Sequence, residues 1–169
     1  MALPRKLKNL NLFNDGDTYL GQIVEVKLPP LTRKMEEYRG GGMNGPIKID
    51  QGQEAINLEW KCGGLMRGTL DQYGVAKHNA VMLRFAGAYQ RDDTGEVDAV
   101  EVVVRGRHEE IDPGNAKAGD DTEFSVKTAC SYYKLTINGA TVIEIDLQNM
   151  VEIVNGVDRL AEQRRAIGA

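Results

Sequence analysis

Alternation of apolar and polar residues runs through most of the chain and predicts a protein built mainly from β-strands. The alternation is clearest in residues 55–62, where one face carries Ile56, Leu58, Trp60 and Cys62. Residues 81–89 and 97–107 repeat the pattern and are separated by turn-forming residues, which predicts a hairpin. Successive side chains of a strand point to opposite faces, so we expect each strand to bury one face.

A second hairpin is predicted from residues 124–137 and 140–147, because Asn138-Gly139 between them is a favoured two-residue turn. Within residues 124–137 the apolar positions change from even numbers to odd numbers. One extra residue in a strand shifts its phase in this way. We therefore expect a β-bulge near residues 131–133.

Residues 20–28 predict a further strand, and the segment that follows predicts a long arm. In the strand, one face carries Leu20, Val24, Val26 and Leu28. Pro29-Pro30 forces extended backbone, and residues 38–45 form a glycine-rich tip that we expect to be flexible. Residues 20–62 are too long and too poor in apolar residues for an ordinary hairpin turn. Residues 28–55 are therefore interpreted as an extended hairpin arm.

Helical spacing occurs in two short segments. Met66, Leu70 and Tyr73 fall at i, i+4 and i+7, and Gly74 is placed as a C-terminal stop. A second amphipathic turn lies within residues 157–167. Neither segment is long enough to be a stable helix alone, so each is expected to pack on a sheet or on another chain.

The composition indicates a single folded domain and argues against nucleic-acid-binding and membrane-spanning proteins. The chain has 169 residues, of which 41% are hydrophobic and 27% charged, values typical of a single folded domain spanning residues 1–169. The 21 Lys and Arg residues against 25 Asp and Glu residues give a net charge of −4, which disfavours a surface built to bind nucleic-acid phosphates. No apolar run approaches the roughly 20 residues of a membrane span, so we expect no stable membrane association.

The glycine-rich tip invites one functional interpretation, which the residues after it disfavour. Gly40, Gly42 and Gly45 match the G-x-G-x-x-G pattern of dinucleotide-binding loops. That pattern needs a helix directly afterwards, whose N-terminal amides bind the pyrophosphate. Here Pro46 and an alternating strand pattern follow. We therefore expect a tip and no cofactor site.

Other candidate chemistry is sparse. Two histidines, His78 and His108, have no partners at metal-ligand spacing, and Cys62 shares an apolar face, which favours a buried thiol. A nucleophilic pair of Cys130 with His108 stays open. The sequence thus predicts no metal site and gives no positive support for an enzyme, although a small enzyme or ligand-binding β-barrel remains an alternative class.

Several blocks of sequence carry a family resemblance. They are LKNLNLFNDG at residues 7–16, the arm with EYRGGGM at residues 37–43, SYYKL at residues 131–135, EID at residues 144–146 and NGVD at residues 155–158. With these blocks the chain resembles the major tail tube proteins of contractile phage tails and the related tube proteins of R-type bacteriocins.

The resemblance implies a mainly β (α+β) fold, a β-sandwich or partial barrel with a flanking short α-helix, a long hairpin arm and a short C-terminal helix. It implies hexameric rings that stack into a hollow tube inside a contractile sheath, in a virion tail assembled in the host bacterial cytoplasm. The implied function is a structural, non-enzymatic conduit driven through the host envelope. A ring protein of type VI secretion, similar to the haemolysin-coregulated protein, is the alternative.

The resemblance also implies partners. They are further copies of the chain, the sheath protein, a baseplate or initiator protein, a tape-measure protein and a tail terminator; DNA passes through without specific binding.

Three segments are expected to contact other subunits, namely residues 1–13, 28–55 and 155–169. The expected contact residues of the arm are Leu28, Leu31, Met35, Tyr38, Gly40, Gly41, Gly42, Met43 and Pro46. Net acidity suits an acidic or neutral lumen that does not hold DNA. Glu59 and Glu101 are candidates to face this lumen.

Overall fold

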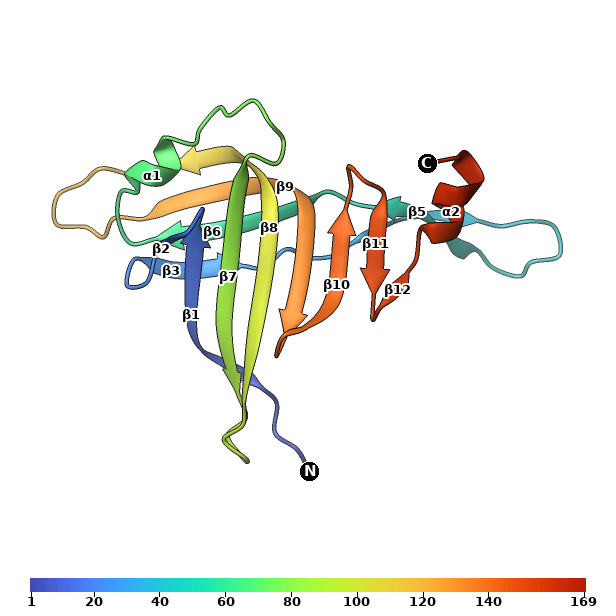
Figure 1. Ribbon diagram of the computed structural model, residues 1–169, viewed down its shortest axis with the longest axis horizontal. Helices are drawn as coiled ribbons and strands as arrows, with labels where there is room; N and C mark the ends of the chain where they lie inside the picture. Colours follow the sequence, from blue (N-terminus) through green and yellow to red (C-terminus); the bar gives the residue numbers. More distant parts are fainter.

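A computed structural model describes residues 1–169 and consists mainly of β-strands, with two short helices, α1 (Arg67–Leu70) and α2 (Ala161–Ile167) (Figure 1). The strands are β1 (Lys6–Asn14), β2 (Asp17–Thr18), β3 (Ile23–Lys27), β4 (Arg33–Tyr38), β5 (Ile47–Gln53), β6 (Ile56–Cys62), β7 (Val81–Gln90), β8 (Val97–Asp112), β9 (Phe124–Ile137), β10 (Ala140–Asp146), β11 (Val151–Val154) and β12 (Val157–Asp158).

Ten strands form one hydrogen-bonded sheet that folds over into two layers. What we call the long layer has the order β12-β11-β10-β9-β8-β7-β1-β2. The short layer consists of β3 and β6 together with the first half of β9 and the end of β8. In Figure 1 the strands of the short layer run crosswise behind those of the long layer. The predicted sandwich or partial barrel is confirmed.

The strands β8 and β9 belong to both layers and make the corner. β9 pairs with β6 through residues 124–130 and with β10 through residues 132–137. Ser131 is the extra residue between these halves, so the predicted bulge is confirmed. Beside it, a Cβ on Gly106 would lie 2.0 Å from the Ala129 carbonyl oxygen, so only glycine permits this close approach of two backbones.

The core fills the space between the layers. The long layer supplies β-strand side chains such as Leu12, Leu83 and Phe85, and the short layer supplies the predicted face of β6 together with Phe124 and Val126. Each of these side chains is almost completely buried. The predicted hairpins are also confirmed: β7 pairs with β8 along its whole length, and Asn138-Gly139 joins β9 to β10 with positive φ at both residues.

The predicted face of residues 20–28 is wrong in its first half and correct in its second half. β3 carries a bulge between Ile23 and Glu25, and this bulge turns Val24 outward, where 66% of it is exposed. Ile23 packs against the core in its place, whereas Val26 and Leu28 pack against the core as predicted. One extra residue before position 25 reverses the alternation, which the apolar pattern alone did not show.

The predicted face of the first helix is also wrong. α1 has only four residues, and it buries Met66 and Thr69, while Leu70 is partly exposed and Tyr73 largely exposed. A single helical turn followed by turns does not keep the i, i+4, i+7 spacing on one face. Gly74 has a positive φ, as expected for a helix stop.

Most of the N-terminal segment, which was expected to contact other subunits, is part of the subunit's own sheet. Residues 6–14 form β1, which pairs with β7 and buries Leu12 in the core. Ion pairs hold this segment to the β7–β8 hairpin tip: Arg5 contacts Asp98, and Lys8 lies 2.9 Å from Asp92. Any contact of this segment with another subunit must therefore come from its open edge and its first residues.

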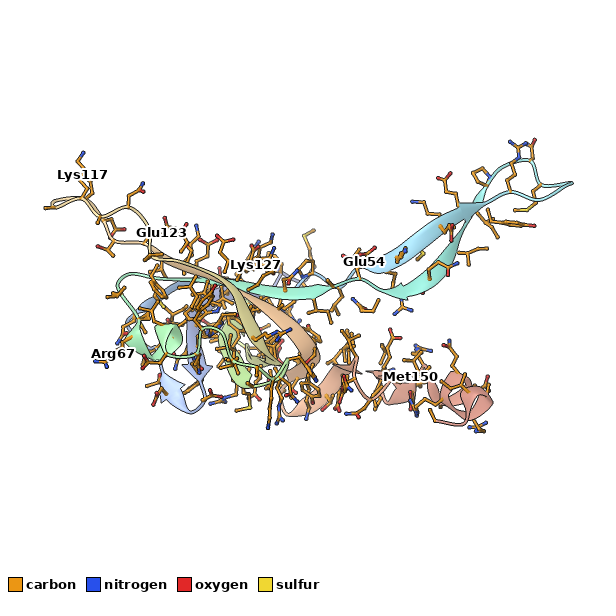
Figure 2. The ribbon with its side chains drawn as sticks, turned by 90° about the horizontal axis from the view of Figure 1, so that it is seen from above. Glu54, Arg67, Lys117, Glu123, Lys127 and Met150 are labelled. Carbon is orange, nitrogen blue, oxygen red and sulfur yellow. The ribbon has the colours of Figure 1, made fainter.

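The arm is a separate two-stranded sheet of β4 and β5. It extends away from the two-layer body in Figure 2, beginning beside the labelled Glu54. None of its residues is buried. The C-terminal segment forms β12 and α2, and α2 ends at Gly168 in the left-handed conformation.

Candidate assembly surfaces

The long layer ends in two strand edges that have no partner in this chain. On one side of β1, β2 pairs only with Phe13 and Asn14, so residues 6–11 are open. The Leu12 N–H donates to Asn11 Oδ1, and the Leu12 carbonyl accepts from the Tyr19 N–H, so these groups point away from β7. By alternation, the N–H and carbonyl of Leu10 point to the same open side. At the far end of the layer, β12 pairs only with β11.

Exposed apolar side chains flank both edges. Leu7, Leu20 and Val24 lie around a groove of about 450 Å³ beside β1. Val157 and Ile167 are exposed at the β12 end. Unpaired strand edges beside apolar side chains are sites at which another chain can add a strand.

The α2 helix is fixed beside the β12 edge. The Arg164 guanidinium donates to the Met150 carbonyl at 2.7 Å and to the Asp158 carboxylate. This contact lowers the pKa of Asp158 below its usual range and raises that of Arg164. The terminal strand and helix therefore form one unit at this edge.

The face of the long layer that points away from the core is bare. Its central strands carry cations and anions in equal number, namely Arg84, Arg105 and Lys134 against Glu101, Glu144 and Asp146. This face therefore has no net formal charge over its centre. Between the charges it carries small side chains such as Ala86, Ala88 and Ala99.

Two of the three cations of the bare face, Arg84 and Arg105, lie against partners in the same face. An Nη of Arg84 lies 3.2 Å from a Glu101 carboxylate oxygen, and its guanidinium stacks 4.0 Å from the Phe13 ring. The guanidinium of Arg105 lies 5.8 Å from the Tyr132 ring centre. A cation held in this way has fewer free donors for an external anion.

The two candidate lumen residues point in opposite directions. Glu101 lies on the bare face of the long layer. Glu59 lies on the outward face of the short layer, 3.7 Å from Lys27 and directly opposite Lys127. Because the core separates these faces, only one of the two glutamates can face a lumen lined by a single face.

The arm has two different faces. Arg33 points toward the body, where it contacts Glu152 of β11 at 2.5 Å and Asp50 of β5 at 2.8 Å. The contact with Arg33 lowers the pKa of Asp50 below its usual range. The opposite face carries an apolar stripe of Tyr38, Ile47 and Ile49, all exposed.

The expected contact residues of the arm divide into three groups. Leu31, Met35 and Tyr38 are exposed as a contact surface requires. Leu28 instead packs against the core of its own subunit. At the tip the Gly40 N–H donates to the Met43 sulfur.

The remaining members of the set lie at or beside the tip, namely Gly41, Gly42 and Pro46. No helix follows the glycines, and the strand β5 begins at Ile47, as the alternating pattern after Pro46 predicted. The sequence interpretation missed Ile47 and Ile49, whose alternation with Lys48 was the available signal.

A groove of about 530 Å³ separates the arm from the body. The base of the arm lines one side, and the loops of β10 and β11 with α2, near the labelled Met150, line the other (Figure 2). The Arg33–Glu152 ion pair crosses this groove. The arm is therefore linked to the body by its two chain connections and by this ion pair.

A buried polar network lies inside the body and connects both layers. His108 contacts Thr128 through Nδ1 at 2.9 Å and Gln72 through Nε2 at 2.9 Å. Gln72 also bonds to Asn14 and Asp15. Because Gln72 donates its amide protons to these two residues, its oxygen accepts from His108 Nε2–H, which assigns the neutral tautomer. Burial lowers the pKa of His108 to about 4.

The open nucleophilic pair gains no support. The Cys130 thiol contacts the Thr128 carbonyl, and His108 contacts Thr128 and Gln72. Burial raises the pKa of Cys130 to about 12 and that of Cys62 to about 11, so both thiols stay protonated. No group of three or more His, Cys, Asp or Glu side chains is placed to hold a metal ion. Neither helix has the length or apolar character needed to cross a bilayer.

Comparisons with known proteins agree with the architecture. The model of the family described as phage tail tube protein FII matches residues 4–168. The tail tube protein of Escherichia phage P2 is 52% identical and covers 99% of both chains, and the major tail tube protein of Serratia phage KSP20 is 39% identical over 89% of this chain and 88% of its own.

Among solved structures, the sheath/tube terminator of the PVC extracellular contractile injection system matches with a TM-score of 0.57 at 13% identity, over 76% of this chain and 94% of its own. The PVC sheath–tube complex matches with the same score at 10% identity, over 76% and 88%. At such identities the likeness supports the fold.

Proposed function

The chain belongs to the phage tail tube protein FII family, and on that premise we propose that its long layer joins copies of itself into the wall of a hollow tube. Its role is structural: it is a tail tube component of a contractile phage tail or of a phage-derived particle. The proposal concerns how this chain builds that tube.

The observation that carries the proposal is the pair of open edges at opposite ends of one sheet. An edge at β1 that pairs with an edge at β12 of the next copy makes a heterologous contact, in which two different surfaces meet. Heterologous contacts produce closed rings when the rotation from one subunit to the next adds up to a full turn. A ring joined in this way leaves no strand edge exposed, because every edge is covered by a neighbour.

The bare face of the long layer is the one that lines the lumen. The other face is covered by the short layer, and the arm extends from the same side (Figure 2). The short layer and the arm fit on the outside of a ring, whereas on the inside they would block the lumen. Glu101 is then a lumen residue, and Glu59 lies on the outer surface.

In this arrangement the rings are hexamers that stack along the tube axis. The apolar stripe of the arm, together with Leu31 and Met35, contacts a neighbouring copy or the next ring. Residues 1–5 and the C-terminal unit of β12 and α2 provide further contacts. Many modest interfaces of this kind add up along a polymer.

The further partners follow from the same role. They are the sheath on the outer surface, a baseplate or initiator protein and a terminator at the ends, and a tape-measure protein in the lumen. DNA passes without specific binding, the particle is a virion tail or its derivative, and the subunit catalyses no reaction. The type VI ring protein is disfavoured because relatives over nearly the full length are tail tube proteins.

Cross-linking tests the ring contact. Leu7→Cys and Val157→Cys place one thiol beside each edge, at positions that are 41% and 51% exposed, whereas the native thiols are buried. Tubes of the double variant, treated with a short bis-maleimide linker, should give a ladder of covalent multimers that ends at the hexamer. Each single variant is the matched control and should give at most dimers. Tubes of the double variant that yield no ladder would refute the edge contact.

A further inference from the structure

The charged residues of the bare face suggest how a wall that contains cations avoids holding DNA. Arg84 lies at the centre of this face, between a carboxylate at 3.2 Å and an aromatic ring at 4.0 Å. The carboxylate belongs to Glu101 of the neighbouring strand β8, and the ring belongs to Phe13 of β1. Arg84 is therefore held flat along the sheet from both sides.

We propose that Glu101 is a masking residue, which occupies the Arg84 guanidinium so that it does not bind phosphates of DNA in the lumen. This inference rests on the proposed function, because it requires the bare face to line the tube. A ring repeats each subunit residue around one circle, so an unmasked Arg84 would present a belt of guanidinium groups to the passing polyanion.

The physical basis is competition for the same donors. Arg binds carboxylate and phosphate with the same fork of N–H groups, so a carboxylate already in place lowers the gain from a phosphate contact. Each cation that neutralises a DNA phosphate releases a counterion, and this release makes the contact strongly favourable at low salt. A wall of masked cations does not gain this free energy of counterion release, because its cations do not neutralise DNA phosphates, and its charged side chains stay hydrated.

A second acid–base pair lies on the same face, but its two side chains are not in contact. Lys134 lies directly opposite Glu144 in the register of β9 and β10, on the same bare face. No ion-pair contact joins the two side chains, so Glu144 adds negative charge beside Lys134 without occupying its ammonium group. We expect its removal to have a smaller effect than removal of Glu101.

The test compares tubes assembled from the full chain with Glu101→Gln and Glu59→Gln. The two glutamates are matched: their side chains are 40% and 45% exposed, and each makes one ion pair with a basic side chain on a neighbouring strand. The probe is a fluorescent double-stranded DNA oligonucleotide, and the measurement is its retention by sedimented tubes over a series of salt concentrations.

We expect Glu101→Gln tubes to retain the oligonucleotide on the order of tenfold more tightly at low salt, with a steeper dependence on salt concentration. Glu144→Gln should give a smaller increase, and so should Glu59→Gln, which frees only a lysine on the outer surface. The double variant Arg84→Gln/Glu101→Gln should return to the wild-type level, because the unmasked cation is gone.

The outcomes separate the inference from the function on which it rests. Wild-type chain that forms no tubes would overturn the proposed function. Normal tubes in which neither Glu101→Gln nor Glu144→Gln raises retention would overturn the masking role alone. An equal rise in the Glu59→Gln tubes, or a rise that persists in the double variant, would show that Arg84 on the bare face is not the DNA contact.

Discussion

The two-layer body and the arm are made of similar strands but are stabilised differently. The body buries Trp60, Phe85 and Phe124 between its layers, and its polar network is fully bonded. The arm has backbone pairing between β4 and β5, yet none of its side chains is buried. An isolated two-stranded hairpin is marginally stable in water. The body therefore has its own core, whereas within the subunit the arm is stabilised mainly by its backbone pairing and by the Arg33–Glu152 ion pair.

This difference indicates how the molecule divides its tasks. Residues that fold the subunit are concentrated in the body, where their loss destabilises the chain itself. The residues that we propose to join subunits lie on the arm and at the open edges, where apolar side chains remain exposed. Substitutions in the two regions should thus separate folding from assembly.

The largest expected contrast comes from truncating one aliphatic side chain in each region. Leu58→Ala removes a side chain that is 1% exposed, and it should lower the free energy of unfolding by about 2–5 kcal/mol. Ile49→Ala removes one that is 41% exposed on the arm, and it should change that free energy by less than about 0.5 kcal/mol. Urea denaturation of the unassembled subunit, followed by Trp60 fluorescence, measures both.

In tube assembly we expect a direct effect from Ile49→Ala, the variant with the smaller effect on unfolding. Ile49→Ala subunits fold normally and should form tubes more slowly, or at higher concentration, than the wild type. Electron microscopy over a concentration series measures this effect. If Ile49→Ala destabilises the isolated subunit as strongly as Leu58→Ala, the division between body and arm is wrong.

The next effect concerns acid pH and lies entirely in the body. Burial lowers the pKa of His108 to about 4, and the charge of Asp15 only partly opposes this shift. The unfolded chain binds a proton near pH 6.5, whereas the folded chain excludes it until about pH 4. The contribution to stability is therefore complete above pH 6.5 and is lost as the pH falls to 4, by about 2–3 kcal/mol.

His108→Asn removes the titrating group and should weaken this pH dependence, although the lost hydrogen bonds lower stability at pH 7.5. Urea denaturation between pH 7.5 and pH 4.5 should show the difference between wild type and variant narrowing as the pH falls. His78→Asn, at an exposed histidine, is the control and should keep the wild-type slope. A constant difference across the range would contradict a neutral buried His108.

The smallest expected effect lies at the junction of the two regions. Glu152→Gln weakens the ion pair with Arg33, which is partly exposed, so the free energy of unfolding should change by less than about 1 kcal/mol. The orientation of the arm should respond more, because this contact crosses the groove. Spin labels on the arm and on β10 should give a broader distance distribution in the variant. Glu36→Gln, on the opposite face of the arm, should leave the distribution unchanged.

Local signals predicted the parts of the fold that local geometry determines. Strict alternation identified the buried face of β6. Asn138-Gly139 identified the turn between β9 and β10. Both features depend on residues close in sequence. The bulge at Ser131 was also predictable, since a phase shift inside one strand is visible in its apolar positions. The long arm was recognisable from its proline pair and glycine-rich tip.

Contacts between distant segments were not predictable in this way. Arg33 and Glu152 are separated by 119 positions, and nothing near either residue indicates the other. The bulge at Val24 was missed because a phase shift in a strand as short as β3 leaves too few positions to show it. The opposite directions of Glu59 and Glu101 required the layer order, which follows from strand pairing across the whole chain.

The strands β8 and β9 pass through both layers, and this continuity affects how the subunit carries load. In a sandwich of two separate sheets, a sideways force is resisted only by side-chain packing. Here the layers cannot slide past one another unless the ladder along β8 and β9 is torn, since the same two backbones continue around the corner at Gly106 and Ser131. A force applied to one layer of such a subunit therefore reaches the other layer through covalent chain as well as through packing.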